Sequence, residues 1–261
     1  MRVVVCTKET PDTAAKVGVT PEGEVTWGDA PLVINPWDEY AVEEALLLKD
    51  RGATSTTVLA VGSESTKEAL KHALAMGIDE AVLVSDPSLA RADTLVTSRA
   101  LARAIEKLDD VSLALFGRET TDRGTGQTPV QVGRRLGWTT LTYVFKIIDI
   151  DFQAGTIKVE RLLEDGKQLV EGRLPAVVSV VKGINEPRYP SFMGIRKASR
   201  AEIPVWSAAD LGLDSSVRAR VTWPEIYAPP PREGECEMIE ADSPDRAAAI
   251  LVDRLIAEKV V

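Results

Sequence analysis

Short apolar segments alternate with longer amphipathic ones through the first half of the chain. We expect strands at residues 2–7, 56–61, 80–85 and 111–116, and helices at residues 35–50, 65–77 and 92–108. Local signals agree, because Asn35 and Pro36 suit a helix start, and Gly52 and Gly77 suit positions just beyond helix ends. Continuous apolar strands separated by helices predict a mostly parallel, Rossmann-like α/β sheet, covered on both faces, with ligands at the carboxyl ends of its strands.

The pattern changes after Trp138. Residues 139–151, 156–163 and 168–182 have the pattern of longer strands, and the short turns at Ala154-Gly155 and Asp165-Gly166 separate them. We therefore predict an antiparallel addition to the same sheet.

Residues 183–200 form a segment of a different kind, in which Pro187, Pro190 and Gly194 predict an irregular loop. Its apolar and basic side chains include Tyr189, Phe192, Met193, Arg196, Lys197 and Arg200. Exposed aromatic and methionine side chains beside basic ones are typical of a partner-docking surface. The alternative is a long loop folded onto the protein's own core.

The C-terminal region predicts an arm. Three prolines at residues 229–231 and Gly234 indicate an extended linker, and Ser243 and Pro244 suit the start of a last helix. Such an arm packs either on its own domain or across another subunit, and the sequence favours neither. We divide the chain into a core, residues 1–200, and an arm, residues 201–261.

Composition mainly excludes functions. The 261 residues are 44% hydrophobic and carry a net charge of -9, which argues against broad binding to a nucleic acid backbone. Cys6 and Cys236 are too few for a four-thiolate cluster, and Cys6 suits a buried thiol better than a disulfide.

No apolar run approaches the roughly 20 residues that span a bilayer, which predicts a cytoplasmic protein. His72 is the only histidine and suits a solvated helix position better than a catalytic triad.

The loop at residues 117–128 follows an apolar strand and leads into a predicted helix. Its glycines allow a ligand to approach the backbone, and its hydroxyls and the helix N-terminus suit phosphate oxygens. The chain has neither a P-loop nor a GxGxxG motif after the first strand, so the loop predicts retention of a nucleotide without its cleavage. Ordinary turn chemistry is the alternative.

Several strings resemble the β subunit of the electron transfer flavoproteins, in the same order along nearly the whole chain. They are NPWDEYAVEEAL, ALAMGIDEAVLV, ADTLVTS, the loop at residues 117–128, and LPAVVSVVKGINEPRYPSFMGIRKA. The resemblance implies an adenine nucleotide α-hydrolase-like fold and a heterodimer in which an α subunit holds most of a redox-active FAD. This subunit would supply one wall around the flavin, its C-terminal arm would pack on the α subunit, and neither role needs a catalytic acid or base.

The resemblance also implies an AMP with a structural role, buried in this subunit. The family's nucleotide-contacting positions fall on Cys6, Asn35, Pro36, Trp37, Asp38, Ser63, Gly117, Arg118, Glu119, Thr120, Thr121, Asp122, Arg123, Gly124, Thr125, Gly126, Gln127 and Thr128. Trp37 would also lie at the flavin edge, although it equally suits a core aromatic beneath its helix.

The segment after NEPRY resembles the family's recognition loop, which docks acyl-CoA dehydrogenases of fatty acid oxidation and related flavoenzymes. The implied partner-binding residues are Glu186, Pro187, Arg188, Tyr189, Phe192, Met193, Ile195, Arg196 and Lys197, with Phe192 as the apolar anchor. Electrons would pass on to an acceptor such as a quinone oxidoreductase, with the flavin domain of the α subunit reorienting between partners.

Some positions depart from the family pattern. In the electron-bifurcating branch a second FAD replaces AMP, and a DGDTAQVGP-like run marks the ligand loop. Arg123, Gly124 and Pro129 differ from that run, which favours AMP, whereas residues 11–13 and 92–94 resemble the bifurcating branch. Leu162 stands where many members carry an acidic residue that contacts the α subunit. A stand-alone nucleotide-binding module is a further alternative, but an ATP-pyrophosphatase is disfavoured because the first strand is not followed by SGGxDS.

Overall fold

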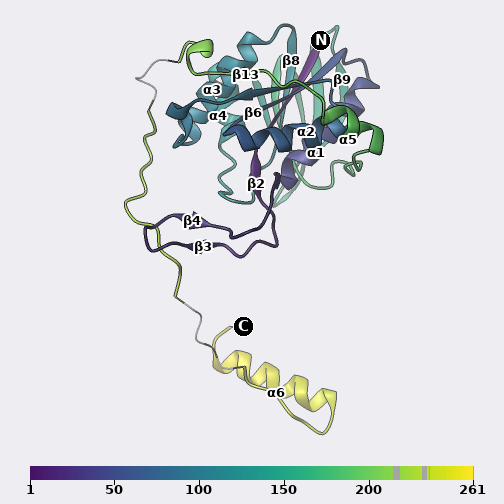
Figure 1. Ribbon diagram of the computed structural model, residues 1–261. Helices are drawn as coiled ribbons and strands as arrows, with labels where there is room; N and C mark the ends of the chain where they lie inside the picture. Colours follow the sequence, from purple (N-terminus) through teal and green to yellow (C-terminus); the bar gives the residue numbers. More distant parts are fainter. Residues whose placement is uncertain (214–217, 231–233, 235, 261) are drawn as a thin grey trace. The chain divides into compact units, whose positions relative to one another are not determined.

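The computed structural model describes residues 1–213, 218–230, 234 and 236–260 (Figure 1). Contacts between residues divide the chain into a compact unit, Met1–Glu225, and a second unit, Ile226–Val261. The first unit therefore extends beyond residue 200, where the sequence placed the end of the core. It is a mixed α/β unit built on a large, mostly parallel sheet, as predicted.

Among the described residues, the main sheet has nine strands in the order β11-β10-β9-β12-β8-β1-β6-β7-β13. The strands are β1 (Arg2–Thr7), β6 (Ser55–Val61), β7 (Glu80–Val84), β8 (Val111–Gly117), β9 (Thr139–Asp151), β10 (Thr156–Leu163), β11 (Gly166–Arg173), β12 (Ala176–Val180) and β13 (Val205–Trp206). Two small antiparallel pairs lie outside it, namely β2 (Glu9–Pro11) with β5 (Leu32–Ile34), and β3 (Gly18–Val19) with β4 (Val25–Thr26).

Helices cover both faces of this sheet. Because successive side chains of a strand point to opposite faces, both sets of side chains are buried in the central strands. Val3 and Val5 of β1 belong to one apolar cluster and Val4 and Cys6 to the other. The first cluster includes side chains of α1 (Pro36–Lys49) and α2 (Lys67–Met76), and the second those of α3 (Thr94–Lys107) and α4 (Thr128–Leu136). Burial on both faces explains why the central strands are continuously apolar.

The predicted strand at residues 168–182 is wrong, because two strands occupy it. β11 is an exposed edge strand that pairs antiparallel with β10, whereas β12 is wholly buried and pairs parallel with both β8 and β9. Pro175 lies between them, and proline has no N–H to continue a ladder of hydrogen bonds. The predicted antiparallel addition is correct for β9, β10 and β11 only.

The predicted irregular loop at residues 183–200 is also wrong in part, since it contains the short helix α5 (Phe192–Ala198). Ser191 is its N-cap, and the Ser191 hydroxyl accepts a hydrogen bond from Gly194 N at 3.0 Å. The backbone of α5 lies very close to α2, because a Cβ at Gly194 would be 2.1 Å from the Ala75 carbonyl oxygen. Gly194 therefore marks a close helix contact here, although glycine in a sequence favours loops.

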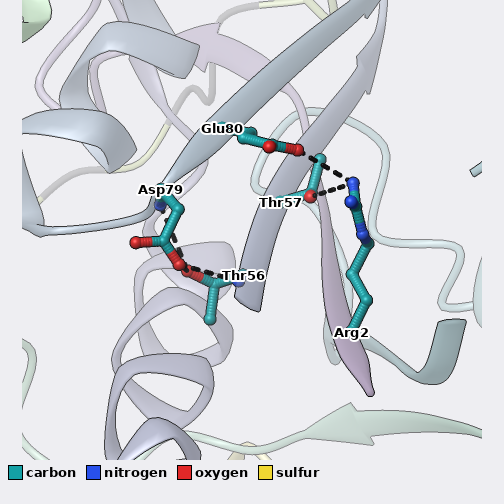
Figure 2. A network of polar contacts seen from close by, with 5 residues as sticks. All are labelled: Arg2, Thr56, Thr57, Asp79 and Glu80. Carbon is teal, nitrogen blue, oxygen red and sulfur yellow. Dashed lines mark hydrogen bonds and ion pairs between the residues drawn. The ribbon is translucent and has the colours of Figure 1, made fainter. Parts of the chain in front are cut away.

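Polar side chains at the amino ends of β1, β6 and β7 contact one another (Figure 2). Nη1 of Arg2 donates to Thr57 Oγ1 at 3.1 Å and to Glu80 Oε2 at 2.8 Å. Oδ2 of Asp79 accepts hydrogen bonds from the backbone N–H and the hydroxyl of Thr56, at 2.9 and 2.8 Å. These contacts tie three neighbouring strands together at this end of the sheet.

In the second unit, the described residues before Ser243 lie outside helices and strands, and α6 (Pro244–Ala257) follows them. The helix begins as predicted, with Ser243 as N-cap accepting from Arg246 N at 3.3 Å. Its described residues include none that is buried. Gly234 and the first two of the prolines at 229–231 are described and lie outside helices and strands, whereas Pro231 lies outside the described residues.

Candidate functional site

A cavity of about 150 Å³ lies at the carboxyl ends of β1, β6 and β8, which is where the sequence predicted a ligand. This volume is roughly ten times what one water molecule needs. Its walls are formed by Cys6, Thr7, Lys8, Asp38, Val61, Thr94, Thr97, Leu101, Phe116, Gly117, Arg118, Glu119, Thr120, Arg123, Thr125, Gly126, Thr128 and Pro129.

Asp38, in the first turn of α1, links the ends of β1 and β8 at the base of this cavity. Its carboxylate accepts hydrogen bonds from Lys8 N, from the Thr7 hydroxyl and from Gly117 N, each at 3.1 Å. Burial raises the pKa of Asp38 to about 7, although these hydrogen bonds and Asn35 act in the opposite direction. The ends of β1 and β8 are thus fixed to the start of α1.

Gly117 is required where β8 meets α1. A Cβ at this position would lie 2.5 Å from Asp38 Oδ1 and 2.6 Å from the carbonyl carbon of Trp37. No side chain fits there without a backbone shift, so the close contact explains why the loop begins with glycine.

Asn35 connects the same helix start to the ligand loop. It occupies the predicted N-cap position, but its side chain makes no capping hydrogen bond. Instead Nδ2 donates to Glu119 O at 2.9 Å, and Oδ1 accepts from Thr121 N at 3.2 Å. The Asn35 side chain therefore orders the first part of the loop.

The rest of the loop is shaped by glycines and one ion pair. Gly124 and Gly126 have φ angles of +58° and +59°, a left-handed conformation that strains other residues. Nζ of Lys8 lies 2.6 Å from Asp122 Oδ2. After Gln127 the chain enters α4, so the N-terminus of a nine-residue helix lies at the cavity.

The chemistry of the walls fits a nucleotide. Cys6, Val61, Leu101 and Phe116 form an apolar part, which suits a base, whereas hydroxyls, two arginines, a lysine and a helix N-terminus suit phosphate oxygens. The Arg118 Nε is buried and has no hydrogen-bond partner among the described residues. A buried donor without a partner costs about 1–3 kcal/mol, so an anionic ligand within reach would be favourable.

Arg118 also lies near two aromatic side chains. Its guanidinium carbon is 5.6 Å from the ring centre of Trp37 and 5.3 Å from that of Tyr143. Both distances are within the range of cation–π attraction, which holds the guanidinium at the rim of the cavity. Trp37 is half-buried and does not line the cavity itself.

The structure brings ten of the predicted nucleotide-contacting residues to the cavity walls, namely Cys6, Asp38, Gly117, Arg118, Glu119, Thr120, Arg123, Thr125, Gly126 and Thr128. The predicted residues that do not line it are Asn35, Pro36, Trp37, Ser63, Thr121, Asp122, Gly124 and Gln127. Ser63 has other contacts, because its hydroxyl lies 3.3 Å from Glu9 Oε1 and 2.7 Å from Ser65 Oγ.

Sequence reasoning missed eight residues of the walls, which are Thr7, Lys8, Val61, Thr94, Thr97, Leu101, Phe116 and Pro129. Five of them, Thr7, Lys8, Val61, Phe116 and Pro129, lie at strand ends or beside a predicted residue, so their positions were available signals. Thr94, Thr97 and Leu101 come from α3, and only the packing of that helix reveals them.

The predicted partner-binding residues lie together after β12. Tyr189, Phe192, Met193 and Ile195 are 94%, 81%, 68% and 54% exposed, and we call these four side chains the docking surface. Glu186, Arg188, Arg196 and Lys197 are exposed beside them, and Pro187 is half-buried. The segment thus presents apolar side chains to solvent instead of folding them onto the core.

Other side chains that could take part in catalysis or bind a metal have ordinary surroundings. Nε2 of His72 lies 3.0 Å from Glu39 Oε1 on the helical surface. Cys6 and Cys236 are both free, and burial raises the pKa of the Cys6 thiol well above its usual value. Within the described part of the chain, no cluster of three or more metal-ligating side chains occurs, and no helix is long and apolar enough to cross a membrane.

Comparisons with known proteins identify the family of this chain. The family model described as "Electron transfer flavoprotein domain" matches residues 28–211. The chain is 37% identical to "Protein FixA" of Azotobacter vinelandii, over 94% of this chain and 90% of that protein. It is 36% identical to "Caffeyl-CoA reductase-Etf complex subunit CarD" of Acetobacterium woodii and to "Electron transfer flavoprotein subunit beta" of Clostridium acetobutylicum, each over the full length of both chains. The chain therefore belongs to the electron transfer flavoprotein β subunit family.

Proposed function

We propose that this chain pairs with an α subunit to form an electron transfer flavoprotein, and that the cavity at the carboxyl ends of β1, β6 and β8 holds an AMP. The cavity is the observation that carries the proposal, because it joins an apolar wall to phosphate-binding groups around one helix N-terminus. Its residues hold a nucleotide in place and do not cleave it.

The FAD would be held mainly by the α subunit, and when bound it supplies the one- and two-electron chemistry. Trp37 and Arg118 would form part of its wall in this chain, since the Arg118 guanidinium lies near the Trp37 ring and Arg118 lines the cavity. The two obvious candidates for acid–base or nucleophilic chemistry are already engaged. Asp38 accepts three hydrogen bonds from this chain, and the buried Cys6 thiol stays protonated at neutral pH.

The donor would be a flavin dehydrogenase, such as an acyl-CoA dehydrogenase, that binds at the docking surface. Large exposed apolar side chains lose contact with water on binding, and a single aromatic often provides much of the affinity. Arg196 and Lys197 would attract an acidic partner and raise its association rate. Electrons would then pass to an acceptor such as a quinone oxidoreductase.

A second candidate is an electron-bifurcating subunit that binds a second FAD in place of AMP. One observation favours it, since Thr94 of the string at residues 92–94 lines the cavity. Asp93 of the same string has a structural role, because it caps α3 through Val96 N at 2.9 Å and accepts from Arg220 N. The loop residues Arg123, Gly124 and Pro129 favour AMP instead.

Nucleotide content tests the proposal. The chain is co-expressed with its α subunit, the complex is purified by size exclusion, and its nucleotides are released with acid and separated by chromatography. We expect one FAD and one AMP per heterodimer. Two FAD without AMP would establish the bifurcating alternative, and a colourless monomer that never joins a yellow complex would refute both and support a stand-alone nucleotide-binding module.

Docking is tested separately with Phe192→Ala. Because this side chain is 81% exposed, its truncation should leave heterodimer assembly and nucleotide content unchanged. It should raise the KM of the reaction in which a reduced acyl-CoA dehydrogenase donates electrons to the complex. Unchanged kinetics would remove the docking role.

A further inference from the structure

We propose that Arg188 and Glu43, helped by Asn185, form a clamp that fixes the position of the docking surface. The inference rests on the proposed function, since it takes the docking surface to be where a flavin dehydrogenase binds. It assigns a positioning role to Glu43 and Asn185, and to Arg188 in place of the direct partner contact that the resemblance implies for it; none of the three lines the cavity or is one of the four side chains of the docking surface.

The docking surface needs such a device because its own helix is short. α5 has seven residues, and an isolated helix shorter than about 12 residues is marginal in water. Three of the four docking side chains project from this helix, and Tyr189 precedes it. Their positions must therefore be set by contacts with the rest of the protein.

One such contact is made by the helix itself. The backbone of Gly194 lies against the Ala75 carbonyl of α2, and Ala198 is buried. This contact fixes the distance between α5 and α2. It leaves the chain before the helix, including Tyr189, to be fixed by something else.

The clamp acts on that part of the chain. Nε and Nη2 of Arg188 donate to the two carboxylate oxygens of Glu43 at 2.8 and 2.7 Å, and Arg188 N donates to Glu43 Oε2 at 3.2 Å. A bidentate arginine–carboxylate pair restricts both distance and orientation. Because the third hydrogen bond comes from the backbone, the clamp fixes the main chain immediately before Tyr189.

Asn185 adds a second point of attachment on the same helix. Its Nδ2 donates to Tyr40 O at 3.0 Å and to Glu44 Oε2 at 2.9 Å. Glu43 and Glu44 are both buried in α1, and burial raises the pKa of Glu44. Two adjacent buried carboxylates are costly on a helix, and their hydrogen-bond partners in the segment that leads to the docking surface offset much of this cost, with a further contribution to Glu44 from the charge of Arg51.

The helix that carries the clamp also begins at the cavity, because Asp38 and Asn35 lie at the start of α1. The clamp therefore holds the docking surface in a fixed position relative to the nucleotide cavity. Fixing a binding segment in advance lowers the entropy lost when a partner docks. Loosening the segment should accordingly weaken docking without changing the chemistry that follows it.

The decisive variant is Glu43→Leu combined with Arg188→Met. Removing both charges leaves no unpaired buried carboxylate, so the stability of the heterodimer should stay close to that of the parent. We expect the KM with a reduced acyl-CoA dehydrogenase to rise by about tenfold, as loss of order in one or two side chains would give. We also expect kcat within about twofold of the parent, one AMP and one FAD per heterodimer, and faster amide hydrogen exchange at residues 185–198.

Arg103→Gln with Glu106→Gln, an exposed ion pair on α3, serves as the matched control and should change none of these.

Arg188→Lys provides an independent check, since lysine keeps the charge but not the bidentate geometry. It should raise the KM by a smaller factor than the double variant. The clamp is refuted if Phe192→Ala raises the KM while the double variant leaves both KM and hydrogen exchange unchanged, or if the double variant loses stability and nucleotide without any change in KM. If Phe192→Ala also has no effect, the docking surface itself is wrong, and the clamp with it, whereas the nucleotide content of the complex would still stand.

Discussion

Polar groups at the two ends of the main sheet have different partners. At the amino ends of β1, β6 and β7, Arg2, Glu80, Asp79 and Thr56 are engaged in contacts between strands (Figure 2). At the carboxyl ends of β1, β6 and β8, threonine hydroxyls and the side chains of Lys8, Arg118 and Arg123 line a cavity. The same sheet thus has one end where polar groups connect its strands and another where they line a cavity, which we propose receives a nucleotide.

Two aspartates show this difference most clearly. Burial opposes ionisation of Asp79, but Lys49 at 2.7 Å and the hydrogen bonds from Thr56 outweigh burial and lower the pKa. Burial dominates at Asp38 and raises its pKa to about 7. The amino end therefore stabilises an ionised carboxylate, whereas the carboxyl end keeps a carboxyl group whose ionisation costs free energy.

The largest effect that would separate the two ends is expected from Gly117→Val. The new side chain would overlap Asp38 and the backbone of Trp37, which should destabilise the fold by about 3 kcal/mol. It should also displace α1 from β8 and abolish nucleotide retention. Urea denaturation and nucleotide release measure the two effects on the heterodimer. Gly18→Ala is the control, because its Cβ would meet only Thr26 Cγ2 at an ordinary 3.6 Å. A Gly117→Val complex that kept its full nucleotide would contradict the role of the close contact between Gly117 and α1.

A second prediction concerns pH. Because the pKa of Asp38 is about 7 in the folded chain and 3.8 ordinarily, the folded state holds this proton more tightly than the unfolded state between those values. The free energy of unfolding should therefore fall as the pH rises from 4 to 7, by at most about 1.4 kcal/mol per pH unit from this group. Asp38→Asn should remove that part of the slope. Parallel pH dependence in the parent and the variant would show that Asp38 does not titrate in this window.

Asp79→Asn should give the opposite and smaller result. The lowered pKa means that Asp79 stabilises the folded state above about pH 4, and that this contribution is lost as the pH falls through the folded pKa. We expect the variant to be about 1 kcal/mol less stable at pH 7, with the difference shrinking in acid. Its nucleotide content should equal that of the parent. Loss of nucleotide from Asp79→Asn would mean that the two ends are not independent.

The sequence predicted the parts of this fold that depend on local signals. Apolar runs located β1, β6, β7 and β8, and the loop at residues 117–128 was placed at their carboxyl ends. The insertion of β12 between β8 and β9 depends on pairing with strands distant in sequence, and Pro175 is the local signal that separates β12 from β11.

The candidate site shows the same limit at the level of single residues. Asn35 was predicted as a helix cap from its neighbours, but its side chain bonds to the backbone of Glu119, 84 positions away. Thr94 and Thr97 reach the cavity only because α3 packs against the sheet beside α4. Glu43 and Arg188 were each part of a recognisable string, yet their pairing is visible only in three dimensions.

The smallest effect that sharpens the comparison comes from two arginines, one at each end. The Nε groups of Arg2 and Arg118 are both buried without a hydrogen-bond partner among the described residues. Both arginines have an ion-pair partner, but Arg2 is hydrogen-bonded to Glu80 at 2.8 Å, whereas the carboxylate of Glu119 lies 3.6 Å from Arg118 Nε, beyond hydrogen-bonding distance. If Arg118 contacts an anionic ligand, Arg118→Met should speed nucleotide release by about three- to fivefold, equivalent to slightly less than about 1 kcal/mol. Arg2→Met should leave the release rate unchanged and lower stability by less than about 1 kcal/mol, as for other partly exposed ion pairs. Release is followed by chromatography after dilution of the heterodimer, and equal rates for both variants would place Arg118 among the structural contacts instead of the ligand contacts.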